Sequence, residues 1–513
     1  MSATEQKIAL RPAGRARRTI KLIELPATKL VDEGGRNWTA LRRREPLVSK
    51  QIVMTQLAAA GFDTVLVNLK DGDEEAETGT VRWRDRVLSK RLVGRVFDDD
   101  PRSADAWAIT INYVQERDAA CELIQRIKAG GGRVIVGGSD AFADPTPYLE
   151  AGCDAVVQDK SGAANAAICD YVCGDEPRAP LTGVLLADGR RFPAKRPPMS
   201  PEDWPLPPPD IVHQTLGIDY WETQLPDALL PIGSVMADIG CDRRCDFCET
   251  PLYKLGYRRM SPATTLEWFA AQKAAGARSV ICPSDQFLAR VLFKEGRDEI
   301  LQIMQGIRDL DLAVLWGNGL EIQKLTVGRG LPGGDLTPDE ELVRAIWGWD
   351  GERGCYQGYI PAERPTFGRE DYAKLLPWQE HKTMVRTIVA AGVPDITYGV
   401  VVGLPEDSHE SFKGLEVAIR ELYAELLEIN PDLIFNVTPY AIRPLPGTPQ
   451  AKQLRAAGLL RFEDPAIIGG FWTACADTEH LSYAEVSDWQ ARLAAIGSAE
   501  LLEWQSITGA RGS

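Results

Sequence analysis

The sequence predicts an α/β protein in which two parallel-sheet domains are followed by a small helical region. Its 513 residues exceed the size at which one hydrophobic core stops growing, so more than one domain is expected. Short β-branched runs alternate with amphipathic stretches twice, as they do in parallel sheets, and a Pro-rich passage separates the two series. We expect a doubly wound, Rossmann-like domain at 1–170, a linker at 171–230, a partial (βα)6 barrel at 231–450 and a helical C-terminal region at 451–513.

The first series predicts five strands and two long helices. The helices are expected at 47–60 and 118–129. The strands are expected at TIKLIELP (19–26), DTVLVNL (63–69), AWAITIN (106–112), RVIVGGS (133–139) and CDAVVQD (153–159). A ligand of such a sheet binds at the carboxyl ends of its strands.

The second series predicts six βα repeats. The strands are expected at IGSVMADIG (232–240), ARSVICPSD (277–285), LAVLWGNG (312–319), CYQGYI (355–360), ITYGVVVGLP (396–405) and LIFNVTPYAI (433–442). Helices are expected between them at 264–275, 295–309, 340–348, 373–391 and 409–428. The active site of a barrel lies at the carboxyl ends of its strands.

Charge and hydropathy exclude two classes of partner. The net charge is −15, which opposes a phosphate backbone, so no nucleic acid is expected. The N-terminus lacks the apolar core of a secretory signal, and no apolar run is long enough to span a bilayer, so a cytoplasmic protein without a membrane partner is expected.

Three of the ten cysteines form a cluster at Cys241, Cys245 and Cys248, with Arg243 and Arg244 between them to favour the thiolate forms. A structural zinc site needs four ligands, yet none of the four histidines lies beside this stretch. An iron–sulfur cluster held by three cysteines keeps one iron open to another ligand, which explains the missing fourth residue. Zinc and a chance grouping of core cysteines remain as alternatives. The other seven cysteines are expected to be packing residues.

The spacing C-x3-C-x2-C after the first strand of a partial barrel resembles the radical S-adenosylmethionine (SAM) superfamily. The resemblance implies a 4Fe-4S cluster on the three cysteines with SAM on the fourth iron, and Phe247 occupies the aromatic position before the third cysteine. GVVVGLPE (399–406) resembles the family's glycine stretch on the fifth strand, so Gly399, Gly403 and Glu406 are implied SAM contacts. PSDQF (283–287) places Ser284 and Asp285 where polar groups meet SAM, although it differs from the commoner Gly-Gly-Glu pattern.

The stretch 134–162 resembles the cobalamin-binding domain that is fused to one large radical SAM class, and RPLPGTPQ (443–450) also resembles that class. A generic nucleotide-binding domain is the alternative, although no G-x-G-x-x-G fingerprint follows the first strand. No histidine precedes His213, so we expect cobalt without a histidine ligand. The residues implied at the cobalamin site are Lys70 for the lower face of cobalt, Asn112, Gly137, Gly138, Ser139 and Gln158.

The resemblance implies a cobalamin-dependent radical SAM C-methyltransferase that moves a methyl group from SAM through methylcobalamin to carbon. The implied partners are a small-molecule or amino-acid acceptor and an electron donor such as a flavodoxin or ferredoxin. ETPLYKLGYRRMSP (249–262) and EHLSYAEVSDWQARL (479–493) resemble the tryptophan indole-carbon methyltransferases of peptide antibiotic biosynthesis. The alternative is a ring contraction, cyclisation or rearrangement with the same cofactors. A non-catalytic sensor would need an output module, which the sequence does not show.

Overall fold

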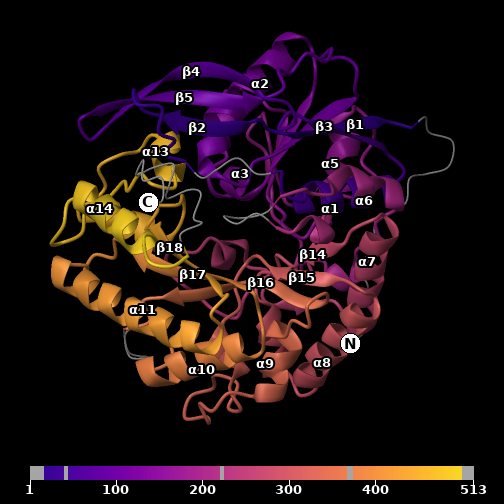
Figure 1. The fold of residues 1–513 in the computed structure, drawn as a ribbon. Helices are drawn as coiled ribbons and strands as arrows, with labels where there is room; N and C mark the ends of the chain where they lie inside the picture. Colours follow the sequence, from indigo (N-terminus) through magenta and orange to yellow (C-terminus); the bar gives the residue numbers. More distant parts are fainter. Residues whose placement is uncertain (1–16, 40–43, 220–224, 367–373, 499–513) are drawn as a thin grey trace.

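The computed structural model describes residues 17–39, 44–219, 225–366 and 374–498. The N-terminal domain stacks on a barrel-like domain, and the C-terminal region lies beside the junction of the two (Figure 1).

The N-terminal domain is built on a seven-stranded sheet in the order β10-β9-β8-β7-β6-β1-β3. The five strands that the sequence predicts are parallel: β1 (Thr19–Glu24), β3 (Asp63–Asn68), β6 (Ala106–Thr110), β7 (Val134–Gly137) and β8 (Ala155–Val157). The chain order reverses between β1 and β6, which is the topological switch point of a doubly wound sheet.

Helices cover both faces of this sheet because its buried side chains alternate between them. From β1, Ile20 and Leu22 pack in the core with Met54 of α1, whereas Ile23 packs on the other face with Ile124 of α2. The helices of the domain are α1 (Val48–Ala59), α2 (Arg117–Ala129), α3 (Ser139–Ala143), α4 (Thr146–Glu150) and α5 (Asn165–Val172).

Two features of this domain differ from expectation. The predicted end at residue 170 lies inside α5, and the sheet continues beyond it through the antiparallel strands β9 (Val184–Leu186) and β10 (Arg191–Phe192). An antiparallel sheet that the sequence did not predict comprises β2 (Ala27–Val31), β4 (Glu74–Trp83) and β5 (Arg86–Gly94). Most of β4 is exposed and charged, so it lacks the apolar alternation that marks a strand.

The expected linker is partly helical. It contains η2 (Pro201–Asp203) and α6 (Pro209–Thr215), and α6 packs against α1. Trp204 Nε1 donates to the carbonyl of Ser161 at 3.0 Å, and its ring lies 6.2 Å from that of Trp268 in α7. This segment therefore binds both domains.

The second domain confirms the six-stranded partial barrel. Its strands are all parallel and follow chain order: β11 (Ile232–Ser234), β14 (Ser279–Ile281), β15 (Ala313–Trp316), β16 (Gly354–Glu363), β17 (Asp395–Val402) and β18 (Ile434–Ala441). The helices are α7 (Pro262–Ala274), α8 (Gly296–Asp309), α9 (Glu340–Trp347), α10 (Trp378–Ala390) and α11 (His409–Ile429). Side-chain caps from Ser261, Asp339 and Ser408 set the starts of α7, α9 and α11.

The C-terminal region is helical, as predicted, with α12 (Pro449–Ala456), α13 (Pro465–Gly469) and α14 (Tyr483–Ala494). It packs on β18 and also on the antiparallel sheet of the first domain. Trp83 and Trp38 of that first domain share a hydrophobic core with Trp472, and Trp83 Nε1 donates to the carbonyl of Ala474 at 3.1 Å. The C-terminal region thus joins the two domains.

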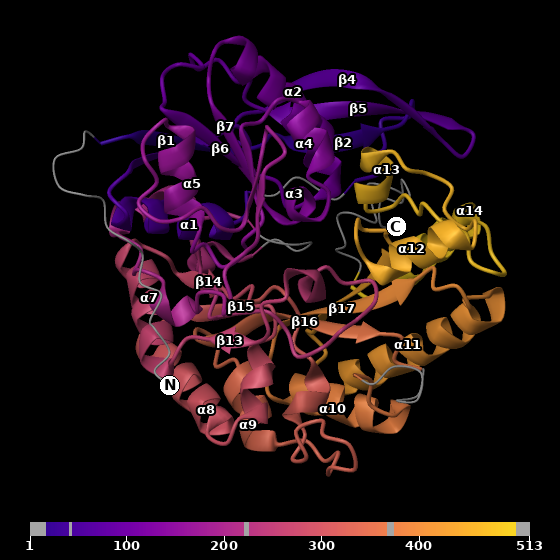
Figure 2. The same ribbon diagram turned by 180° about the vertical axis from the view of Figure 1, so that it is seen from behind.

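The carboxyl edges of the two sheets face one another (Figure 2). Phe142, in α3 after β7, contacts Tyr253, which follows the third clustered cysteine, with the ring centroids 5.1 Å apart. At one side of the junction, Gln272 Nε2 of α7 donates to Gln51 Oε1 of α1 at 3.1 Å. Among the described residues, no helix is both long and apolar enough to cross a membrane.

Candidate functional site

The three clustered cysteines lie on a loop between two short antiparallel strands, β12 (Asp238–Ile239) and β13 (Arg258–Arg259). Gly240 begins this cysteine loop (240–257) with a φ of 77°, and a Cβ there would lie 1.7 Å from the carbonyl oxygen of Gly256. Only glycine lets the ends of the loop come so close. All three thiols are free and half-buried at the carboxyl end of the barrel.

The cysteine loop offers three thiols as candidate metal ligands. Among the described residues, no three His, Cys, Asp or Glu side chains are grouped as the ligands of one metal ion would be. A four-iron cluster spaces its thiolates more widely than one ion does, and three thiols on one loop leave one iron open.

Burial disfavours the thiolate forms of Cys241 and Cys248. It raises the pKa of Cys241 to about 11 and also raises that of Cys248. The structure does not show the expected stabilisation of the thiolates by the side chains of Arg243 and Arg244. The Arg243 side chain binds Glu321, and Arg244 is exposed. It is the backbone N–H of Arg243 that donates to Cys241 Sγ, at 3.3 Å, and binding of a metal would have to displace the thiol protons.

Glu321, which follows β15, the third strand of the barrel, holds the cysteine loop, which follows the first. Its carboxylate accepts hydrogen bonds from Arg243 Nε at 3.0 Å and Gln286 Nε2 at 3.1 Å, and it forms an ion pair with Lys324. Lys324 also lies 3.1 Å from Asp242. Burial opposes the charge of Glu321, but Lys324 and Arg243 lower its pKa to about 2. An ionised, 4% exposed carboxylate therefore fixes the loop between the first two cysteines.

We expect Glu321→Gln to loosen the cysteine loop. The change leaves Arg243 and Lys324 without their buried counter-charge, and breaking a buried ion pair costs about 3–5 kcal/mol. Iron retained per chain after reconstitution and gel filtration should fall by about half or more, and the urea midpoint should also fall. The control is Glu352→Gln, which changes an exposed carboxylate. If Glu321→Gln retained as much iron as this control, the network would have no part in holding the loop.

The two polar residues expected to meet SAM after β14 support the cysteine loop. Ser284 is 3% exposed, and its Oγ accepts the N–H of Ala237 at 3.0 Å. Asp285 is half-buried, and its carboxylate accepts the N–H of Gly240 at 2.6 Å. Both side chains therefore fix the backbone that leads into the first cysteine.

The glycine stretch of β17 lies at the same edge of the barrel. A Cβ at Gly399 would lie 2.1 Å from Tyr359 Oη, and Gly403 has a φ of 85°. Glu406 is exposed. Phe247 is half-buried and packs on the hydrophobic cluster of Ile442, Leu454 and Ala476.

The carboxylate that shapes this turn is Asp407, which sequence reasoning missed. It accepts the N–H groups of Gly403 and Leu404 at 2.8 and 2.9 Å, and it pairs with Arg364 at 2.6 Å. The Asp407 and Arg364 side chains are 0% and 2% exposed, respectively. In the sequence, the only sign of this role is an acidic residue four positions after the glycine at the end of the strand.

The residues expected at cobalamin follow the carboxyl ends of the first sheet. Gly138 has a φ of 103°, and a Cβ there would lie 2.0 Å from the carbonyl oxygen of Ile111, whereas a Cβ at Gly137 would meet nothing closer than 3.7 Å. Ser139 Oγ accepts a hydrogen bond from Lys160 Nζ, and Gln158 Nε2 donates weakly to two α3 carbonyls at 3.4 Å. Asn112 is half-buried after β6, and its N–H contacts Glu116 at 3.3 Å.

Lys70 belongs to a charged group at the switch point that the sequence did not reveal. Glu24, the last residue of β1, is buried and pairs with both Lys50 and Lys70, the latter at 3.5 Å. Burial opposes these charges, yet Lys50 and Lys70 lower the pKa of Glu24, and nearby carboxylates raise that of Lys70. Burial and Glu24 raise the pKa of Glu116 to about 7. The position predicted for cobalt's lower face is therefore polar.

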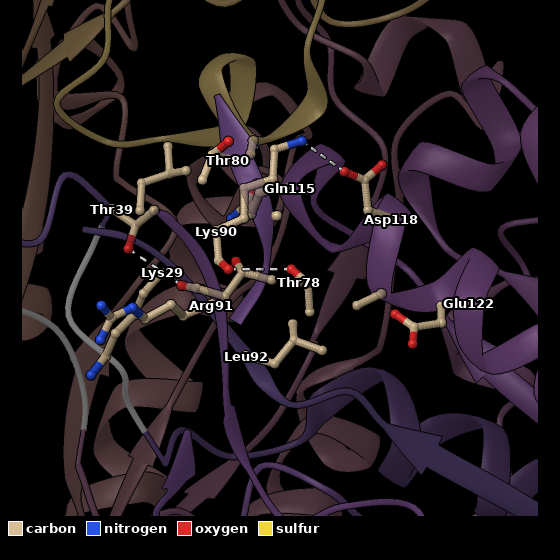
Figure 3. A pocket seen from close by; sticks show the side chains of 15 residues that line it. Lys29, Thr39, Thr78, Thr80, Lys90, Arg91, Leu92, Gln115, Asp118 and Glu122 are labelled. Atoms are coloured by element: carbon tan, nitrogen blue, oxygen red, sulfur yellow. Dashed lines mark hydrogen bonds and ion pairs between the residues drawn. The ribbon is translucent and has the colours of Figure 1, made fainter. Parts of the chain in front are cut away.

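A separate pocket of about 300 Å³ lies between the antiparallel sheet and α2 (Figure 3). Its walls include Thr39, Thr78 and Thr80, and its Lys90 is paired with Asp118 at 3.1 Å. The predicted site residues are not among those that line this pocket.

Comparison with known proteins agrees with the architecture. No protein-family model matches the chain. The ribosomal protein uS12 methylthiotransferase RimO of Frankia casuarinae is 30% identical over 227 residues, which are 39% of this chain and 42% of RimO.

Two solved structures are similar over most of this chain. One is the cobalamin-dependent SAM radical enzyme OxsB with aqua-cobalamin and SAM bound, with a TM-score of 0.65 and 14% identity over 92% of this chain and 66% of OxsB. The other is the radical SAM methyltransferase TsrM from Kitasatospora setae with cobalamin and a 4Fe-4S cluster bound, with a TM-score of 0.56 and 15% identity over 87% of this chain and 76% of TsrM. The chain spans just under two thirds of OxsB and less than half of RimO. This chain therefore has the fold of the cobalamin-dependent radical SAM enzymes.

Proposed function

We propose that the chain is a cobalamin-dependent radical SAM C-methyltransferase acting on a small molecule or amino acid, with tryptophan as the candidate acceptor. The observation that carries the proposal is the direct contact of the cysteine loop with the segment 137–143, here called the glycine loop, which ends β7 and includes α3. The contact is made by Tyr253 and Phe142. Two cofactors held by these loops would face each other across the domain boundary. TsrM, whose fold this chain shares, is a methyltransferase with the same two cofactors.

The chain's own residues have distinct parts in this proposal. Cys241, Cys245 and Cys248 would hold the cluster, and Gly399 in β17 and Gly403 just after it would line the SAM site. Gly138 and the residues beside it would hold the nucleotide tail of cobalamin, and Lys70 would be the polar residue near cobalt in place of a histidine. When bound, the cluster would supply electrons for SAM cleavage, and cobalamin would carry the methyl group. A flavodoxin or ferredoxin would be the reductant.

The second candidate function is a ring contraction, cyclisation or rearrangement with the same cofactors. OxsB favours it, because its TM-score is higher than that of TsrM and its description names a radical enzyme rather than a methyltransferase. A shared fold does not decide between the two.

One reconstitution separates the two functions without knowledge of the acceptor. The full chain is loaded anaerobically with iron, sulfide and hydroxocobalamin, reduced, and mixed with SAM that carries a deuterated methyl group. A methyltransferase should form about one S-adenosylhomocysteine per chain and transfer the labelled methyl group to the corrinoid. Formation of 5′-deoxyadenosine alone would favour the second candidate, and formation of neither product would contradict both.

A further inference from the structure

Lys160 stands at the boundary between the two domains. It follows β8 at the carboxyl edge of the first sheet and is half-buried. Its Nζ donates to Ser139 Oγ at 3.0 Å and lies 4.9 Å from the ring centroid of Tyr253. Tyr253 ends the short helix η4 (Thr250–Tyr253), which follows the third cysteine. One ammonium group therefore touches both the glycine loop and the cysteine loop.

Three buried cations in the described part of the chain each have a carboxylate partner, whereas the half-buried Lys160 has none. Lys50, Lys324 and Arg364 pair with Glu24, Glu321 and Asp407, respectively. In the described part of the chain, the hydrogen bond of Lys160 goes to a hydroxyl group, and no carboxylate lies within ion-pair distance of it. Burial lowers the pKa of Lys160, against the attraction of Asp285 and Glu249.

Those two carboxylates are engaged within the cysteine loop. Asp285 accepts the N–H of Gly240 at 2.6 Å, and Glu249 accepts the Tyr253 hydroxyl at 3.4 Å. An ammonium group has three donors, and Lys160 uses one of them. Because a buried cation is costly unless it is paired, the two remaining donors favour a ligand that brings its own carboxylate.

The surrounding charge narrows the class of ligand. Lys160 is one positive charge near two carboxylates, Asp285 and Glu249. A plain oxyanion such as phosphate would add negative charge to a site where two carboxylates already outnumber one ammonium group. A zwitterion adds no net charge, because its carboxylate meets the ammonium group and its own ammonium group meets the carboxylates.

We propose that Lys160 binds the carboxylate of an α-amino-acid group between the two domains. The inference rests on the proposed function, which places SAM and the acceptor at this boundary. Two ligands carry that group, namely SAM in its methionyl part and an amino-acid acceptor such as tryptophan.

The test uses the full chain, reconstituted with iron and cobalamin, as Lys160→Met and Lys160→Arg variants. Equilibrium binding is measured for two pairs of probes, SAM with 5′-methylthioadenosine and L-tryptophan with indole. The second member of each pair lacks the α-amino-acid group. A hydrogen bond to a charged group contributes about 1.5–3 kcal/mol, so the Kd of the amino-acid member should rise about 10- to 100-fold in Lys160→Met. Lys160→Arg should recover part of the loss.

The probe pairs identify the source of the carboxylate. If SAM binds more weakly while the Kd of 5′-methylthioadenosine is unchanged, the site belongs to SAM. If L-tryptophan binds more weakly while the Kd of indole is unchanged, the site belongs to the acceptor. Unchanged Kd values for both amino-acid probes would overturn the proposal, as would a loss confined to cobalamin. Iron content and melting temperature report folding, and Lys195→Met, which changes an exposed lysine of the same domain, is the control. Failure of the proposed function would appear separately, as absence of S-adenosylhomocysteine from the unaltered protein.

Discussion

Cys245→Ala should abolish the iron–sulfur cluster. Cys245 is the central thiol of the cysteine loop, and a cluster that already uses only three protein ligands has none to spare. After anaerobic reconstitution, iron should fall from about four per chain to below about one, with loss of the visible absorption of the cluster. Cobalamin should still bind, because its predicted site lies in the other domain.

Cys121→Ala is the matched control for this change. Cys121 is half-buried like Cys245, but its thiol donates to the carbonyl of Pro147 at 3.7 Å in the first domain. This variant should keep its full iron content. A Cys245→Ala protein with about four irons and a normal cluster spectrum would contradict the assignment of the ligands.

Gly138→Ala should weaken cobalamin binding while the cluster remains. The new Cβ would lie 2.0 Å from the carbonyl oxygen of Ile111, at a φ of 103° that L-residues rarely adopt. The loop must then move away from the end of β6, which displaces Ser139 and Asn112 together. We expect at least a tenfold increase in the Kd for hydroxocobalamin, about 1.4 kcal/mol, measured by ultrafiltration.

The neighbouring glycine provides the control. A Cβ at Gly137 would meet only Val157, at 3.7 Å, so Gly137→Ala should bind cobalamin nearly as the unaltered protein does. Equal affinities for the two variants would show that the close approach at Gly138 has no part in the site. Iron content reports whether the second domain of each variant has folded.

The sequence predicted the elements whose patterns are local. Buried parallel strands such as β7 and β17 are short, continuous apolar runs, and the prediction located all eleven parallel strands of the two sheets. The three cysteines were found because their spacing carries chemical information by itself. The glycines at 138 and 399 were found through resemblance, and the structure adds the steric reason for each.

What the sequence could not predict depends on contacts between distant segments. The strands β4 and β5 are half-exposed and charged, and they acquire their packing from Trp472 and its neighbours near the other end of the chain. Glu321 supports the cysteine loop although it lies 78 residues after Arg243 in the sequence. Lys160 becomes distinctive only when Tyr253 is brought to it by the stacking of the two domains.

The central claim is that a cluster on the cysteine loop and cobalamin at the glycine loop face each other across the domain boundary. Electron paramagnetic resonance of the full chain, loaded with iron, sulfide and cobalt(II) cobalamin, tests it directly. Because two paramagnets at a shared boundary relax each other, reduction of the cluster should accelerate the relaxation of the cobalt(II) signal, and Cys245→Ala should abolish that acceleration. A cobalt(II) signal whose relaxation is the same with the cluster oxidised and reduced would contradict the account.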